Sequence, residues 1–313
     1  MSKTTNARGE KTRRSPLLLR GMLAVLALAA LIAAYAFLTG GPGAPSPGAG
    51  ASERPLVGGD LHAMTVDPED PDRVMVGGHG GAAISEDAGA TWRQIDDLEG
   101  ADPMGWVVDP RNPSRMYAGG HPGLYRSGDG GESWERDNSG LPATDVHGLG
   151  MDPSDPDTLY ASLVGAGLYR SPNAGESWEA VNAGVGVMGP ILVDPGDPRT
   201  LYVAGMEGDF LRTEDGGRTW RRLGVIPGGM AMWVSQSVAD PAVVYAAAGG
   251  GAFESTDGGE SWRPVGEGLP AGVSTVAVAP DNPRVVYAGV LEGEEALVYR
   301  SGDGGESWEA RNG

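Results

Sequence analysis

An eight-residue segment with the pattern S-x-D-x-G-x-[ST]-W occurs six times, and this repetition constrains the fold more than any other feature of the chain. Successive copies are spaced 42, 44, 42, 42 and 46 residues apart, measured between their tryptophans, which are Trp92, Trp134, Trp178, Trp220, Trp262 and Trp308. The acidic position is held by Asp87, Asp129, Asn173, Asp215, Asp257 and Asp303. A period of this length indicates one supersecondary unit repeated side by side.

A second element, which begins as Val-Asp-Pro at 66–68, recurs with the same period. It returns at 108–113, 151–156 and 193–198, with degenerate copies at 237–241 and 279–283, and a tyrosine usually follows it. Between these marks, short apolar runs alternate with polar residues; in the second unit they cover 105–108, 116–119, 124–126 and 133–136. Each run is too short for a helix and is bounded by Gly, Pro or Asp. Four strands per unit predict an all-β fold, a six-bladed propeller with four-stranded antiparallel blades over 55–313.

The repeats resemble the Asp box, or BNR repeat, of sialidases, sortilin-type receptors and the photosystem II assembly propeller. The resemblance covers 55–313 and extends to bacterial sialidase-type proteins classed with the glycosyl hydrolases. It implies that each box forms the turn between the third and fourth strands. Six equivalent boxes in a ring cannot all contact one substrate, so we interpret their Asp residues as turn caps and not as catalytic or Ca²⁺-binding groups. The box tryptophans are expected to pack against neighbouring blades.

The N-terminal part has the pattern of a membrane anchor. Residues 1–16 are basic, 17–38 contain an uncharged apolar run, and 39–54 are rich in Gly, Pro, Ala and Ser. Positive charge before an apolar segment predicts a cytoplasmic N-terminus, a single membrane-spanning helix and a flexible linker. The propeller would then lie on the extracytoplasmic side of the cell membrane. Alternatively, Ala34-Tyr35-Ala36 offers a cleavage site, and the protein would be secreted.

Charge and cysteine content exclude several classes of function. The net charge is −19, and residues 1–38 contribute +5, which leaves −24 for the remainder. An acidic domain without a basic stripe repels phosphate, so nucleic acid is not an expected partner. The chain has no cysteine, which excludes disulfides, thiolate metal sites and cysteine nucleophiles. We expect the propeller to be a monomer.

Two positions in the repeat hold all four histidines of the protein. In a propeller, residues just before the first strand and just after the second strand lie near one mouth of the central channel. The first position holds His62, Met104, His147, Gly189, Met232 and Ser274, and the second holds His79, His121, Val164, Met206, Gly249 and Leu291. Trp106 and Trp233 flank the first position, and Asp60, Asp102 and Asp145 precede it by two residues. Duplication of one structural histidine would also give this pattern, but we favour a ligand-binding site.

The residue types at this mouth suggest three kinds of chemistry. Imidazole with thioether favours copper, and methionine selects Cu⁺. We therefore name His62, His147, Met104, Met206 and Met232 as candidate metal ligands. Histidine with carboxylate would suit Zn²⁺, and an Asp–His pair could also transfer protons.

Three functions fit the sequence. We favour an extracytoplasmic binding module with copper, a protein or a carbohydrate as its ligand. A glycoside hydrolase would need two carboxylates, which Asp60, Asp102 and Asp145 could supply. Sialidase activity is not expected, because Arg126, Arg170, Arg212 and Arg300 directly precede the boxes, on the opposite face. A scaffold for assembly of a membrane complex is the third function.

Overall fold

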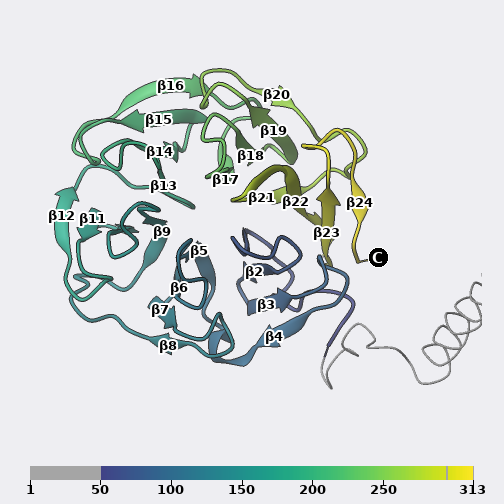
Figure 1. Cartoon of the computed structure of the whole chain (residues 1–313), viewed down its shortest axis with the longest axis horizontal. Coiled ribbons are helices and arrows are strands. Elements are labelled where there is room, and N and C mark those ends of the chain that lie inside the picture. Colours follow the sequence, from purple (N-terminus) through teal and green to yellow (C-terminus); the bar gives the residue numbers. More distant parts are fainter. Residues whose placement is uncertain (1–50, 294, 313) are drawn as a thin grey trace, which may run out of the picture. The chain divides into compact units, whose positions relative to one another are not determined.

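The alternating apolar runs form six separate four-stranded antiparallel sheets, arranged around a centre as in a six-bladed propeller (Figure 1). The computed structural model describes residues 51–293 and 295–312. The basic segment 1–16, the predicted anchor 17–38 and most of the linker therefore lie outside the described residues. Within the described part of the chain, no helix combines the length and the apolar character that a membrane span requires.

The first three blades follow one another without interruption in the sequence. Blade 1 contains β1 (Ala63–Val66), β2 (Val74–Gly78), β3 (Gly81–Ser85) and β4 (Arg93–Ile95), followed by the short 3-10 helix η1 (Asp96–Leu98). Blade 2 contains β5 (Pro103–Val108), β6 (Met116–Gly120), β7 (Gly123–Ser127) and β8 (Glu135–Arg136). Blade 3 contains β9 (Val146–Met151), β10 (Leu159–Leu163), β11 (Gly167–Ser171) and β12 (Glu179–Asn182). The predicted strands of the second unit are confirmed, but the first begins two residues earlier and the fourth two residues later than expected.

The last three blades repeat the arrangement. Blade 4 contains β13 (Leu192–Val193), β14 (Leu201–Ala204), β15 (Asp209–Thr213) and β16 (Arg221–Val225). Blade 5 contains β17 (Ala231–Gln236), β18 (Val244–Ala248), β19 (Gly251–Ser255) and β20 (Arg263–Pro264). Blade 6 contains β21 (Val273–Ala279), β22 (Asn282–Glu292), β23 (Glu295–Ser301) and β24 (Glu309–Ala310). Each sheet orders its strands as they occur in the sequence, with the first strand nearest the centre (Figure 1).

Each box forms the turn between the third and fourth strands, and its side chains close that turn. In blade 5, the Ser255 hydroxyl accepts the N–H of Gly259 at 2.8 Å and donates to Asp257 Oδ1 at 2.7 Å. Asp257 in turn accepts the N–H and the hydroxyl of Ser261, at 2.9 and 2.5 Å. Trp262 donates its indole N–H to the carbonyl of Gly259. The box carboxylates are therefore occupied within the turn, as a structural role requires.

These hydrogen bonds lower the pKa of the box carboxyls. The hydroxyls of Ser133, Ser261 and Ser307 are the main cause, and each holds the pKa of its box aspartate at about 2, against an ordinary value of 3.8. A carboxyl with a lowered folded-state pKa contributes stability above its unfolded pKa and loses it as the pH falls through the folded value.

We therefore expect the urea midpoint of unfolding to fall between pH 3.8 and about pH 2. Asp257→Asn should make this dependence less steep by the share of one box carboxyl, because Asn173 already holds the same turn in blade 3 without a titrating group. Unfolding measured by fluorescence across that pH range tests this expectation. Equal slopes for the wild type and Asp257→Asn would contradict it.

The ring closes by side-chain contacts, because blades 1 and 6 exchange no strand. Tyr287 of blade 6 donates its hydroxyl to the carbonyl of Pro71 in blade 1, at 2.8 Å. Arg311, after the last strand, donates to the carbonyl of Ala88 at 2.8 Å. Val298 and Tyr287 also share one buried apolar cluster with Trp92. Side chains of blade 6 therefore contact blade 1 directly, both at its box and at the loop between β1 and β2.

The segment before β1 adds a second closure. Ser52 exchanges two backbone hydrogen bonds with Trp92, both 2.8 Å long. Two residues later, Arg54 forms an ion pair with Glu295 of blade 6 at 2.5 Å. The segment 52–57 thus ties together the two blades at which the ring closes.

Candidate functional site

The two faces of the propeller carry different loops. The box turns lie beside the Asp-Pro loops, where Ala88 donates its N–H to the carbonyl of Asp72 at 2.7 Å. Because the strands are antiparallel, the turns that join the second strand of each blade to the third lie on the opposite face. The connections between blades lie on that face as well. This face carries His62, His79, His121 and His147, and we call it the histidine face.

A β-bulge presents the first of the two predicted positions on this face. In blades 2, 3, 5 and 6, the inner strand has one extra residue relative to its partner, and these residues are Met104, His147, Met232 and Ser274. A bulge re-aims a side chain away from the regular alternation of a strand. In blade 1, His62 stands just before β1 and donates its N–H to Gly77 at 3.1 Å.

A cavity of about 170 Å³ opens among these residues, and we call it the methionine pocket. Its thioether side chains are Met104, Met188, Met206, Met230 and Met232. Asp60, His62, His79 and Trp233 line the same cavity. The side chain of Met206 is exposed, at 56 %, as Met230 and Met232 are to a lesser extent. The structure thus brings together seven of the residues selected from the sequence, contributed by blades 1, 2, 4 and 5.

Two methionines of the pocket were not predicted. Met188 and Met230 lie in the connections that lead into blades 4 and 5, outside the aligned positions. Met230 is two residues before Met232, so the spacing M-x-M was a usable signal. Met188 directly precedes Gly189, the residue of blade 4 at the first aligned position, and no other blade has a methionine at the equivalent place, so the repeat alignment does not mark it.

Beside the pocket, two histidines lie between two aspartates. Asp60 Oδ2 is 2.6 Å from His79 Nδ1 and 3.4 Å from His62 Nδ1. On the other side of the rings, Asp102 lies 3.1 Å from His62 Nε2 and 3.8 Å from His79 Nε2. The ring centroids are 5.2 Å apart, and the rings are nearly perpendicular. Donor atoms of Asp60, His62 and His79 are close enough together to hold a single metal ion.

His62 is the most buried residue of this group. Only 7 % of it is exposed, and Nε2 lies 3.1 Å from Asp102 Oδ1 without hydrogen-bond alignment. Both atoms are buried and have no hydrogen-bond partner among the described residues. An unpaired buried polar atom costs about 1–3 kcal/mol, so these two atoms are a site of unfavourable energy next to the pocket.

The other two histidines form a separate cluster with Asp145. Asp145 Oδ1 is 2.9 Å from His147 Nε2 and 3.2 Å from His121 Nε2, and the two nitrogens are 3.0 Å apart. His147 does not line the methionine pocket but borders a neighbouring hollow. The five metal ligands expected at one site are therefore divided between two places.

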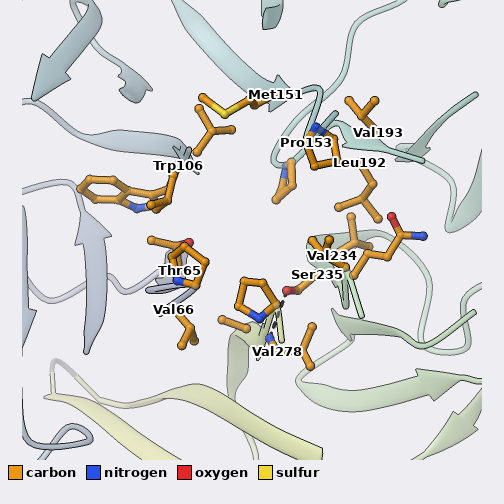
Figure 2. Close-up of a pocket in the computed structure, with 18 of the residues that line it drawn as sticks. Thr65, Val66, Trp106, Met151, Pro153, Leu192, Val193, Val234, Ser235 and Val278 are labelled. Atoms are coloured by element: carbon orange, nitrogen blue, oxygen red, sulfur yellow. Dashed lines mark hydrogen bonds between the residues drawn. The ribbon is translucent and has the colours of Figure 1, made fainter. Parts of the chain in front are cut away.

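Only one of the two buried tryptophans borders the methionine pocket. Trp233 lines both this pocket and the central channel of the propeller, whereas Trp106 packs edge to face on Trp134, with ring centroids 5.6 Å apart. Trp106 lies two residues beyond the bulge at Met104, deeper along β5, and it lines the central channel (Figure 2). That channel is apolar, as Val66, Met151 and Val278 illustrate (Figure 2), and none of the described residues lining it is ionisable.

Comparisons with known proteins support the fold but do not identify a function. No family model matches the sequence, and no curated protein matches it. Among solved structures, the GH74 enzyme of Niastella koreensis superposes with a TM-score of 0.59 at 18 % identity, covering 82 % of this chain and 46 % of the enzyme. The GH74 xyloglucanase of Xanthomonas campestris gives a TM-score of 0.57 at 22 % identity, covering 83 % of this chain and 46 % of the enzyme.

A structure of YCF48 bound to D1 peptide superposes with a TM-score of 0.53 at 17 % identity, covering 83 % of this chain and 84 % of YCF48. This chain spans less than half the length of the two GH74 enzymes but most of the length of YCF48. At such low identities, the likeness extends to the architecture of the fold, which enzymes and a peptide-binding protein share. The chain is therefore a six-bladed β-propeller whose solved structural neighbours include GH74 enzymes and YCF48.

Proposed function

We propose that this protein is an extracytoplasmic, membrane-tethered binding module that holds a soft metal ion, Cu⁺, in the methionine pocket. One observation carries the proposal: five thioethers, two imidazoles and a carboxylate border a single cavity of about 170 Å³. Soft thioether ligands select Cu⁺ over harder divalent ions, and imidazole accepts copper as well.

The surroundings of the pocket support this choice. Met206, Met230 and Met232 keep large parts of their flexible side chains exposed, so that they can rearrange around an ion without disturbing the core. The opposite wall offers His62, His79 and Asp60 as nitrogen and oxygen donors. Asp102 contacts the far side of both rings, where it can orient them as carboxylates commonly orient metal-bound histidines.

The two other functions have weaker support. For a glycosidase, Asp60, Asp102 and Asp145 would have to act on a sugar, but each already contacts at least one histidine. Thioethers also offer little to sugar hydroxyls, which need hydrogen-bond partners. A scaffold function remains compatible with the peptide seen on YCF48, and it would require no metal.

The proposal is tested by Cu⁺ titration of the full-length chain in detergent, without oxygen and against a chromogenic Cu⁺ chelator. The triple variant Met104→Leu, Met206→Leu, Met232→Leu removes three sulfur atoms and keeps the apolar volume. We expect its Cu⁺ affinity to fall about 100-fold or more, since even supporting residues of metal sites contribute about 10–100-fold. Met116→Leu makes the same change in the buried core and should leave the affinity unchanged.

Equal Cu⁺ affinities for the wild type and the triple variant would overturn the proposal. In that case, capture of a membrane protein by a chain that binds no copper would support the scaffold. Release of a chromogenic aglycone that is lost on Asp60→Asn or Asp102→Asn would instead support the glycosidase.

A further inference from the structure

The three side chains of the second cluster form a compact triangle of donor atoms. His121 Nε2, His147 Nε2 and Asp145 Oδ1 are separated by 2.9, 3.0 and 3.2 Å. Ligands at about 2.0–2.2 Å from a zinc ion lie about 2.9–3.5 Å from each other, in octahedral and tetrahedral geometry respectively. The triangle thus already has the dimensions of one face of a coordination polyhedron.

One atom of the cluster lacks a hydrogen-bond partner in the described part of the chain, while the two ring nitrogens are hydrogen-bonded to each other. Asp145 Oδ1 is buried and has no hydrogen-bond partner, although two ring nitrogens lie within 3.2 Å of it. The two Nε2 atoms also face each other, so at most one of them can carry its proton toward the other. A cation in front of the triangle would engage all three lone pairs at once.

We propose that His121, Asp145 and His147 form a second metal site, which holds a borderline divalent ion such as Zn²⁺. Two histidines and one carboxylate are a common ligand set for zinc, and they leave further coordination positions open. An ion can reach the cluster from solvent, because the side chains of His121 and Asp145 are 45 % and 38 % exposed. The inference does not depend on copper binding in the methionine pocket.

A comparison of two neighbouring seams explains why the two sites should select different ions. At the seam of blades 1 and 2, the turn histidine, the preceding aspartate and the bulge residue are His79, Asp102 and Met104. At the seam of blades 2 and 3, the equivalent residues are His121, Asp145 and His147. The bulge residue therefore offers a thioether, from Met104, at the first seam and an imidazole, from His147, at the second. This exchange shifts the ligand set from soft to borderline.

The two sites also lie close together on the histidine face. The hollow beside His147 has a volume of about 310 Å³ and shares Met188 and Met206 with the methionine pocket. Variants must therefore be tested for both ions, so that a loss at one site is not mistaken for a loss at the other.

The test is a Zn²⁺ titration by calorimetry of the full-length, metal-stripped chain in detergent, with Co²⁺ absorption as a second readout of the ligand set. The double variant His121→Ala, His147→Ala is expected to lose one zinc equivalent, seen as a drop of about 100-fold or more in the affinity of that step. His147→Met, which copies the first seam, should weaken Zn²⁺ binding and retain Cu⁺ binding. His62→Ala with His79→Ala should retain the zinc step and weaken the binding of Cu⁺.

The opposite pattern would overturn the inference. Zinc isotherms and Co²⁺ spectra that are the same for the wild type and the His121/His147 double variant would show that the triad is only a hydrogen-bonded pair of histidines beside a carboxylate. Loss of zinc in the His62/His79 variant alone would place the ion at the methionine pocket. Melting curves of the metal-free variants verify that each is folded.

Discussion

Replacement of Trp92 by alanine is expected to lower the melting temperature by about 6–20 °C. Trp92 is 1 % exposed, and loss of a buried tryptophan costs about 3–5 kcal/mol. For a domain of this size, each kcal/mol shifts the melting temperature by about 2–4 °C. Circular dichroism or calorimetry of the full chain measures the shift directly.

The position of Trp92 in the ring makes the effect large. Its indole packs in a cluster with Tyr287 and Val298, which belong to blade 6. Its backbone also exchanges two hydrogen bonds with Ser52, in the segment before β1. Blade 6 and blade 1 share no strand, so the packing of Trp92 closes the ring together with the contacts of Tyr287, Arg311 and Arg54. A void at this seam weakens the one junction that chain connectivity does not support.

The matched control is Trp134→Ala in blade 2, which changes the same box position at a junction that the chain itself crosses. Trp134 is also buried and donates its indole N–H to Gly131 at 3.1 Å, as Trp92 does to Gly89. We expect a smaller loss of stability than at Trp92. Equal losses of stability at the two positions would contradict this expectation. They would show that a box tryptophan contributes as much at an internal junction as Trp92 does where the ring closes.

The sequence was sufficient for the architecture because each blade repeats its own signals. The box predicts a turn wherever Ser255, Asp257 and their equivalents occur. Each such turn also predicts one strand before it and one strand after it. The tyrosines of the second strands, such as Tyr160 and Tyr287, are buried as core positions should be. These features are local, so one sequence without relatives reveals them.

The site was only partly predictable, because it depends on contacts between blades. Alignment of the repeats placed His62, His79 and Met206 at the same mouth, but it did not separate them from His121 and His147. The histidines divide into two clusters because each turn contacts a particular neighbouring blade. An alignment of the repeats does not show which blade that is. For the tryptophans the signal was present, because Trp106 stands two residues after Met104 whereas Trp233 directly follows Met232, so the two are not equivalent.

Gly78→Ala is expected to weaken Cu⁺ binding about 100-fold without removing any donor atom. A Cβ at position 78 would lie 1.7 Å from the carbonyl oxygen of Asp60 and 2.6 Å from that of Val57. Both are backbone atoms, so the segment that presents Asp60 and His62 must move. A displacement of about 1 Å at a preorganised site can cost about 100-fold.

The control for this prediction is Gly128→Ala, at an exposed box position where a Cβ would meet nothing within 4 Å. It should leave both the melting temperature and the Cu⁺ affinity unchanged. Overpacking at Gly78 should also cost about 1–3 kcal/mol of stability, which thermal unfolding measures separately. If Gly78→Ala lost stability but bound Cu⁺ like the wild type, Asp60 and His62 would not be ligands. The ion would then be held by donors outside the displaced segment, such as the methionines, which belong to blades 2, 4 and 5 and to the connections that lead into them.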